Sequence, residues 1–180
     1  MIIGRLGKPA SLLLSAAAFA MLSSCANIPQ TKDEPRGELA ANVAVKAVVD
    51  ASGAATFSYA GDFTDANGNL DFSKEAAGNT VHITFTLAEG SSAGLTFKSE
   101  GPDAMWIVDK KNVDPDGSPQ GPYQGRQFYG FETSKDGLTF TVTDQNDDGV
   151  LYRYGLRFDY NGSTVLDDPD VKNGGSGGHG

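Results

Sequence analysis

The heptapeptide VHITFTL at residues 81–87 decides the fold, because apolar and polar side chains alternate strictly along it. Every odd position is aliphatic or aromatic, and every even position is His or Thr. Successive side chains of a β-strand point to opposite faces, so this period of two predicts a strand with one buried face and one solvated face. β-Branched and aromatic residues, which suit a pleated surface, fill the segment.

The same period recurs along the rest of the chain. Residues 138–143 (LTFTVT) and 152–158 (YRYGLRF) alternate in the same way. Shorter alternating or apolar runs lie at residues 43–49, 55–59, 95–97, 105–108 and 128–131. Gly, Pro, Asp and Asn separate the runs, and no helical period of 3.6 follows the first 24 residues. The pattern predicts an all-β fold, an immunoglobulin-like antiparallel β-sandwich of eight or nine strands, with a closed barrel as the second choice.

The N-terminus predicts export and lipid attachment. Arg5 and Lys8 precede an apolar stretch at residues 11–22, which is too short to span a bilayer but has the shape of a secretory signal. The next residues, Leu22-Ser-Ser-Cys25, resemble the lipobox of bacterial lipoproteins. That resemblance implies cleavage before Cys25 and acylation of its thiol and amine, with palmitate among the attached fatty acids. Ala26 in place of Asp favours the outer membrane, with the domain facing the periplasm or the cell surface.

Composition divides the chain into four parts. Residues 1–24 are the predicted signal peptide, and residues 25–40 combine the acylated cysteine with a polar tether that contains two prolines. Residues 41–172 hold the predicted sandwich, and residues 173–180 form a Gly-rich tail.

Charge limits the partners. The chain carries a net charge of −9, and removing residues 1–24, which hold two cations and no acid, changes it to −11. Such an acidic surface argues against nucleic acid and against flat adsorption onto anionic lipid. The lipid on Cys25 is therefore the expected attachment to the membrane. Because Cys25 is the only cysteine, its acylation leaves no thiol for a disulfide or a nucleophile.

Two acidic turns have the spacing of calcium loops. Residues 144–149 (DQNDDG) fit the opening of an EF-hand loop, in which alternate oxygen ligands wrap a hard cation, but Gly155 stands where the bidentate Glu is needed. Residues 112–117 (NVDPDG) repeat the spacing. If the strands are antiparallel, both loops emerge at one end and could form a composite Ca²⁺ site from Asp114, Asp116, Asp144, Asn146 and Asp148. Simple turn chemistry explains the same residues, and we favour it.

Trp106 is the candidate binding residue. It is out of phase with Met105 and Ile107, which suit the inner face, and an exposed Trp on a sandwich marks a contact surface. Burial on both sides is the simpler interpretation. His82 shares a strand face with Thr84, and no nucleophile or carboxylate stands near it in sequence, so we interpret it as an exposed strand histidine.

The C-terminal quarter resembles a known family. Residues 152–156 (YRYGL) and 165–173 (VLDDPDVKN) resemble the closing signature of the DP-EP family of small bacterial β-sandwich proteins, although Asp167 is inserted and Lys172 replaces an apolar residue. The resemblance implies a sandwich and raises self-processing at Asp168-Pro169. In the physical route, the Asp168 carboxylate attacks a carbonyl and the proline nitrogen leaves. The simpler interpretation is that Pro169 ends the last strand.

The sequence thus predicts a cell-envelope lipoprotein with a non-catalytic domain that binds an envelope protein or a glycan. A calcium-stabilised structural or adhesive module is one alternative. A protein that cleaves itself at Asp168-Pro169 is another, and a hydrolase with turnover ranks last.

Overall fold

The structure, a computed structural model, describes residues 36–74, 76 and 78–175. These residues form eleven strands, one four-residue α-helix and one turn of 3₁₀-helix. The elements are β1 (Glu38–Val49), β2 (Ala55–Gly61), β3 (Leu70–Asp71), β4 (Thr80–Leu87), β5 (Thr96–Phe97), α1 (Gly101–Ala104), β6 (Met105–Asp109), η1 (Lys110–Asn112), β7 (Phe128–Thr133), β8 (Thr139–Asp144), β9 (Leu151–Tyr160), β10 (Ser163–Asp167) and β11 (Asp170–Lys172). No helix in this part of the chain has the length and hydropathy needed to cross a membrane.

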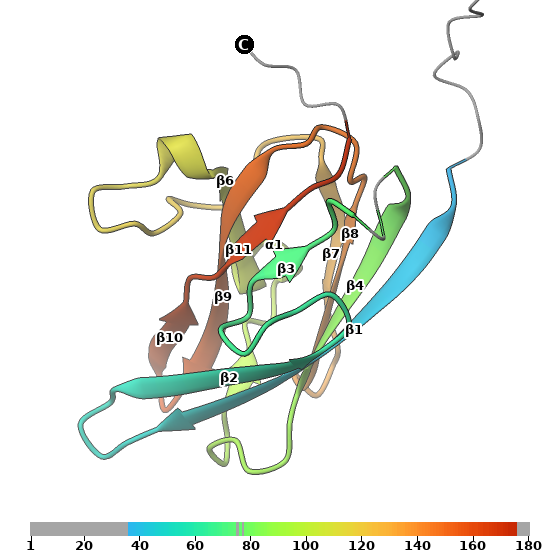
Figure 1. The fold of residues 1–180 in the computed structure, drawn as a ribbon. Helices are drawn as coiled ribbons and strands as arrows, with labels where there is room; N and C mark the ends of the chain where they lie inside the picture. The colour runs from blue at the N-terminus through green and yellow to red at the C-terminus, as the bar shows by residue number, and fades with distance from the viewer. Residues whose placement is uncertain (1–35, 75, 77, 176–180) are drawn as a thin grey trace, which may run out of the picture. The chain divides into compact units, whose positions relative to one another are not determined.

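The strands form two sheets (Figure 1). The first sheet has the order β2-β1-β4-β8-β7. In the second sheet, β9 pairs with β10 and β11 along one edge and with β5 and β6 along the other, and β3 pairs with β11. The predicted all-β sandwich is confirmed. The prediction of purely antiparallel pairing is wrong at two places, because β1 runs parallel to β4 and β3 runs parallel to β11.

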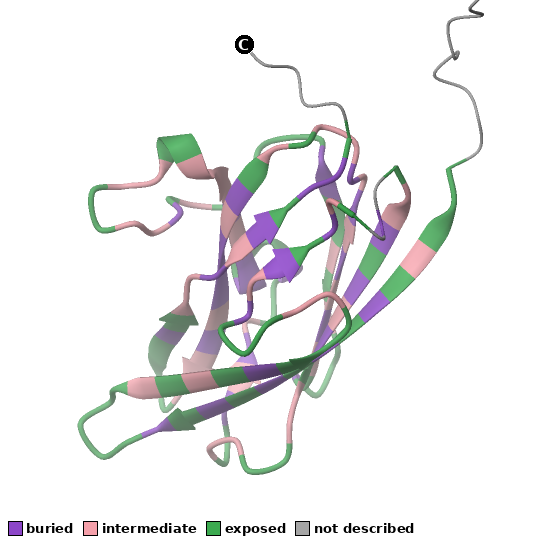
Figure 2. Cartoon of the chain, in the orientation of Figure 1, coloured by how far each residue is buried: buried purple, intermediate pink, exposed green. Residues whose placement is uncertain are grey.

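Alternating side chains from both sheets fill the core. Buried and exposed residues alternate along β1, and buried residues recur at every second position in β4 and β8 (Figure 2). Phe85 of β4 stacks on Phe140 of β8, with ring centroids 6.2 Å apart. The two sheets meet at two aromatic pairs. The ring centroids of Phe85 and Tyr154 lie 5.9 Å apart, and those of Phe140 and Phe97 lie 5.8 Å apart. The period of two in VHITFTL therefore places its aromatic residue at the centre of the sandwich.

Strands β10 and β11 behave as one interrupted strand. Asp167 pairs with Leu156 and Asp170 pairs with Arg153, so both segments keep the same register on β9. Asp168 and Pro169 separate them, because proline has no N–H to donate to the ladder. The carbonyl of Pro169 still accepts a hydrogen bond from the Tyr154 N–H at 2.9 Å. The prediction that Pro169 ends the last strand is therefore wrong.

The sandwich extends further at both ends than predicted. β1 begins at Glu38, which pairs with Thr80, so residues 38–40 belong to the first sheet and not to the tether. Asn173 and Gly174 are buried and belong to the fold, not to the tail, because their polar groups bind the loop between β8 and β9. The predicted signal peptide, Cys25, the predicted tether up to residue 35 and the residues from 176 onward lie outside the described residues.

Candidate functional site

The outer face of the second sheet carries the candidate site. The even-numbered residues of β9 from Tyr152 to Phe158 point into the core, so Gly155 and Arg157 lie on the outer face, where Arg157 is half-buried and Gly155 is covered by neighbouring side chains. Trp106 of β6 pairs with Gly155 and lies on the same outer face of the sheet. Its neighbours Met105 and Ile107 are buried, as the alternation of side chains along the sequence predicts. On the other edge of β9, Leu166 pairs with Arg157.

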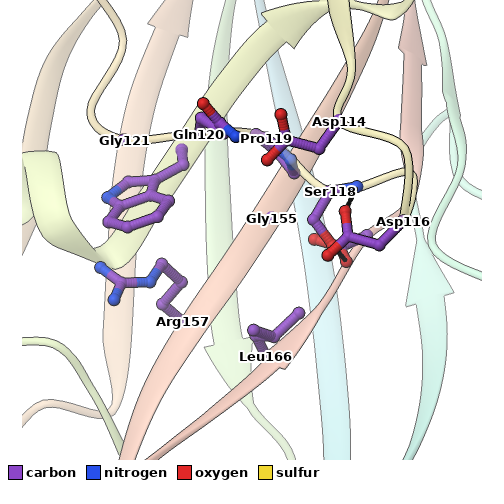
Figure 3. A pocket seen from close by; sticks show the side chains of 11 residues that line it. Asp114, Asp116, Ser118, Pro119, Gln120, Gly121, Gly155, Arg157 and Leu166 are labelled. Carbon is purple, nitrogen blue, oxygen red and sulfur yellow. Dashed lines mark hydrogen bonds between the residues drawn. The ribbon is translucent and has the colours of Figure 1, made fainter.

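A pocket of about 360 Å³ opens over this face. The segment that follows η1 forms its second wall, and Figure 3 shows Asp114, Asp116 and Ser118 of that segment facing Arg157 and Leu166 of the sheet. We call it the outer-face pocket. Its main lining residues are the apolar Trp106, Pro119 and Leu166 and the acidic Asp114, Asp116 and Asp168.

Gly155 forms the floor of the pocket because nothing larger fits there. A Cβ atom at this position would lie 2.8 Å from Oδ1 of Asp168 and 3.5 Å from Cγ of Pro119. The missing side chain thus lets the Asp168 carboxylate lie across β9. Asp168 stands at the break between β10 and β11, where the pairing with β9 is interrupted.

Turn chemistry shapes the acidic wall. Residues 114–117 (DPDG) form a β-turn in which the Gly117 N–H donates to the Asp114 carbonyl at 2.8 Å, and Gly117 has a φ of +88°. The next residue, Ser118, donates its N–H to Asp116 Oδ1 at 3.0 Å and its hydroxyl to Asp168 Oδ2 at 2.8 Å. One serine therefore orients two carboxylates.

The positive charge that acts on the acidic side of the pocket is that of Arg153, which already forms an ion pair with Asp170. Burial raises the pKa of Asp168, and the neighbouring carboxylates of Asp167 and Asp116 raise it further. The Ser118 hydrogen bond and the charge of Arg153 act in the opposite direction. Burial also raises the pKa of Asp167, which accepts a hydrogen bond from the Tyr59 hydroxyl at 2.6 Å.

The positive charge that lines the pocket is already engaged. The guanidinium carbon of Arg157 lies 3.7 Å from the centroid of the Trp106 ring, a cation–π contact. Nη1 of Arg157 also donates to the Asp103 carbonyl at 2.9 Å. Nε1 of Trp106 is buried and has no hydrogen-bond acceptor among the described residues. The indole is thus held in place, with one ring face covered by the guanidinium.

The residues of the predicted composite calcium site lie in two different environments. Asp114 and Asp116 line the outer-face pocket. Asp144 is fully buried, and its Oδ1 accepts hydrogen bonds from Gln127 Nε2 at 3.0 Å, the Asn146 N–H at 2.8 Å and Asn173 Nδ2 at 3.2 Å. These bonds tie the loop after β8 to the end of the fold.

Asn146 and Asp148 also bind the protein itself. The Asn146 amide donates to the Ala76 carbonyl at 2.6 Å and accepts from the Gly174 N–H. Asp148 accepts from the Tyr152 hydroxyl at 2.6 Å. Among the described residues, no three His, Cys, Asp or Glu side chains gather closely enough to hold a metal ion. The calcium site therefore stays a prediction from sequence, and so does self-processing at Asp168.

His82 has two neighbours that sequence reasoning missed. Its Nδ1 lies 3.1 Å from the Thr143 hydroxyl and its Nε2 lies 3.8 Å from the Glu38 carboxylate. Both partners come from other strands of the first sheet. The side chains of His82 and Glu38 are 49% and 75% exposed, and a contact so open to water contributes little to stability.

Comparison with known proteins gives no relative. No model of a known protein family matches the chain, and no curated protein matches it. The function is therefore inferred from the sequence and from the geometry of the pocket.

Proposed function

We propose that the chain is a bacterial envelope lipoprotein that presents a non-catalytic binding domain. A lipid on Cys25 holds it in the outer membrane, and the outer-face pocket is its binding site. The observation that supports this proposal is the pocket itself, in which an ordered Trp, an apolar floor and a few oriented polar groups converge. Protein binding sites for small groups commonly have this composition.

The hydrogen bonding within the pocket favours binding over catalysis. The carboxylate of Asp168 accepts from Ser118, and Arg157 stacks on Trp106. The histidine of the described chain, His82, lies on the outer face of the other sheet. The pocket thus offers fixed recognition groups, and the ligand is a segment of an envelope protein or a part of a glycan.

Replacing the predicted anchor tests the first half of the proposal. In a bacterium with two membranes, the full chain should fractionate with the outer membrane and should carry the added mass of acyl chains. The Cys25→Ser variant should lose that mass and leave the membrane fraction, because no acylated cysteine remains. Ala26→Ser, which leaves the cysteine in place, is the matched control. A wild-type protein without acyl chains would contradict the proposal.

A further inference from the structure

We propose that the outer-face pocket binds a primary ammonium group on an aliphatic stem, such as a lysine side chain of a partner peptide. This inference rests on the proposed function, because it names the ligand chemistry of the same pocket.

The charge balance of the pocket supports a cation. Three carboxylates, those of Asp114, Asp116 and Asp168, line it against one guanidinium, that of Arg157. Arg157 lies over Trp106 and donates to a backbone carbonyl, so it does not form an ion pair with these acids in the described structure. The carboxylate of Asp116 is close enough to Asp168 to disfavour the charged form of Asp168 and so raise its pKa. A ligand cation between them relieves that repulsion.

The hydrogen-bonding capacity of the acids also fits an ammonium group. An ionised carboxylate offers about four acceptor positions, and Ser118 uses one on Asp116 and one on Asp168. Within the part of the chain that the structure describes, no other hydrogen bond reaches these two carboxylates, so the remaining positions can accept donors from a ligand. An ammonium group has three donors and no acceptor, so it complements a site that consists mainly of acceptors.

The apolar lining fits the stem of such a ligand. Leu166 is 48% exposed although it is a large hydrophobic residue, and it lines the pocket together with Gly155 and Pro119. A methylene chain that covers Leu166 would remove apolar surface from water. The pocket therefore offers apolar contact along the stem and carboxylates at its tip.

A sugar fits the same site less well. Proteins bind sugar rings largely by stacking them on aromatic faces, and Arg157 already covers one face of Trp106. An anion is disfavoured by the three carboxylates. We therefore assign the ammonium ligand and treat the sugar as an outcome of the test.

Trp106 is the only tryptophan of the chain, so its fluorescence reports on this pocket alone. The full chain, in a non-ionic detergent, is titrated with three probes: Nα-acetyl-lysine methylamide, Nα-acetyl-norleucine methylamide, which has the same four-carbon stem without the ammonium group, and N-acetylglucosamine. We expect a saturable change with the lysine probe only, and we expect salt to weaken it. Asp116→Asn and Asp168→Asn should each weaken binding about tenfold, as expected for a charge-assisted hydrogen bond. Glu89→Gln, which removes an exposed acid elsewhere, should leave it unchanged.

The outcomes separate the two proposals. If the norleucine probe binds as tightly as the lysine probe, or if only N-acetylglucosamine binds, the ammonium assignment is wrong and the pocket remains the binding site. If none of the three probes changes the fluorescence, both the ammonium assignment and the role of the pocket are contradicted. Asp116 is exposed in a turn, so the Asp116→Asn variant should fold. It therefore tests the ammonium assignment even if the Asp168→Asn variant does not fold.

Discussion

Raising the pH from about 4 to about 8 should destabilise the protein, by up to about 4 kcal/mol from Asp144 alone. This carboxyl is fully buried, and burial raises its pKa from 3.8 to about 7. The charge of Asp148 raises it too, whereas hydrogen bonds from Asn146, Gln127 and Asn173 lower it. Between the two pKa values the folded state binds a proton that the unfolded state has lost, so stability falls as the pH rises through this range.

The hydrogen bonding around Asp144 leaves a place for that proton. Oδ2 of Asp144 and Oδ1 of Asn173 are both buried without a hydrogen-bond partner in the described structure. A carboxylic acid and an amide can pair through two hydrogen bonds, and the bond from Asn173 Nδ2 to Asp144 Oδ1 is already present. A proton on Oδ2 supplies the donor that the two unpartnered oxygens lack.

The Asp144→Asn variant should therefore be more stable than the wild type at pH 8, by as much as a few kcal/mol, and about equal to it near pH 4. The amide can keep the accepted bonds and donate to Asn173 without ionising. Chemical denaturation of the full chain across this pH range measures the difference. Glu89→Gln is the control for net charge. A variant that is less stable than the wild type at every pH would show that Asp144 is needed as a carboxylate.

Replacing Phe85 by Ala should destabilise the protein by about 3–5 kcal/mol. Its ring, on β4, is fully buried and contacts Phe140 of the same sheet and Tyr154 of the other sheet. The substitution leaves a cavity between two packed layers, which can close only in part. Urea denaturation at constant pH measures the loss.

Thr86→Ala provides the matched control for this core prediction. Thr86 is the next residue of the same strand and is exposed, so its substitution should cost less than about 1 kcal/mol. A one-residue shift of β4 would exchange the two faces. Equal losses for Phe85→Ala and Thr86→Ala, or a larger loss for Thr86→Ala, would contradict the sandwich register.

The sequence predicted the strands well because alternation is a local signal. The segments around Phe85, Phe140 and Phe158 each carry the period of two, and each forms a strand with the expected face buried. Pairing direction depends on residues far apart in the chain. The parallel pairs β1–β4 and β3–β11 therefore could not be predicted, and β3, only two residues long, gave no periodic signal.

The candidate site was predicted only in part, for a related reason. Trp106, Asp116 and Asp168 were singled out for three separate hypotheses, and the structure places all three in the lining of one pocket. Their meeting depends on the pairing of β6 with β9 and on the gap that Gly155 leaves, neither of which the residue types reveal. The phase of Arg157 in YRYGLRF indicates an outward side chain, but not its contact with Trp106.

The central claim is that the outer-face pocket, rather than the acidic loop after β8, is where this domain binds its ligand. Two-dimensional ¹⁵N NMR of the full chain, recorded while Nα-acetyl-lysine methylamide is added, tests it residue by residue. The account predicts that the Trp106 indole resonance and the amides of Gly155 and Ser118 shift saturably, whereas those of Asn146 and Thr84 do not. Shifts confined to Asn146 and its loop, or to Thr84 on the first sheet, would contradict it.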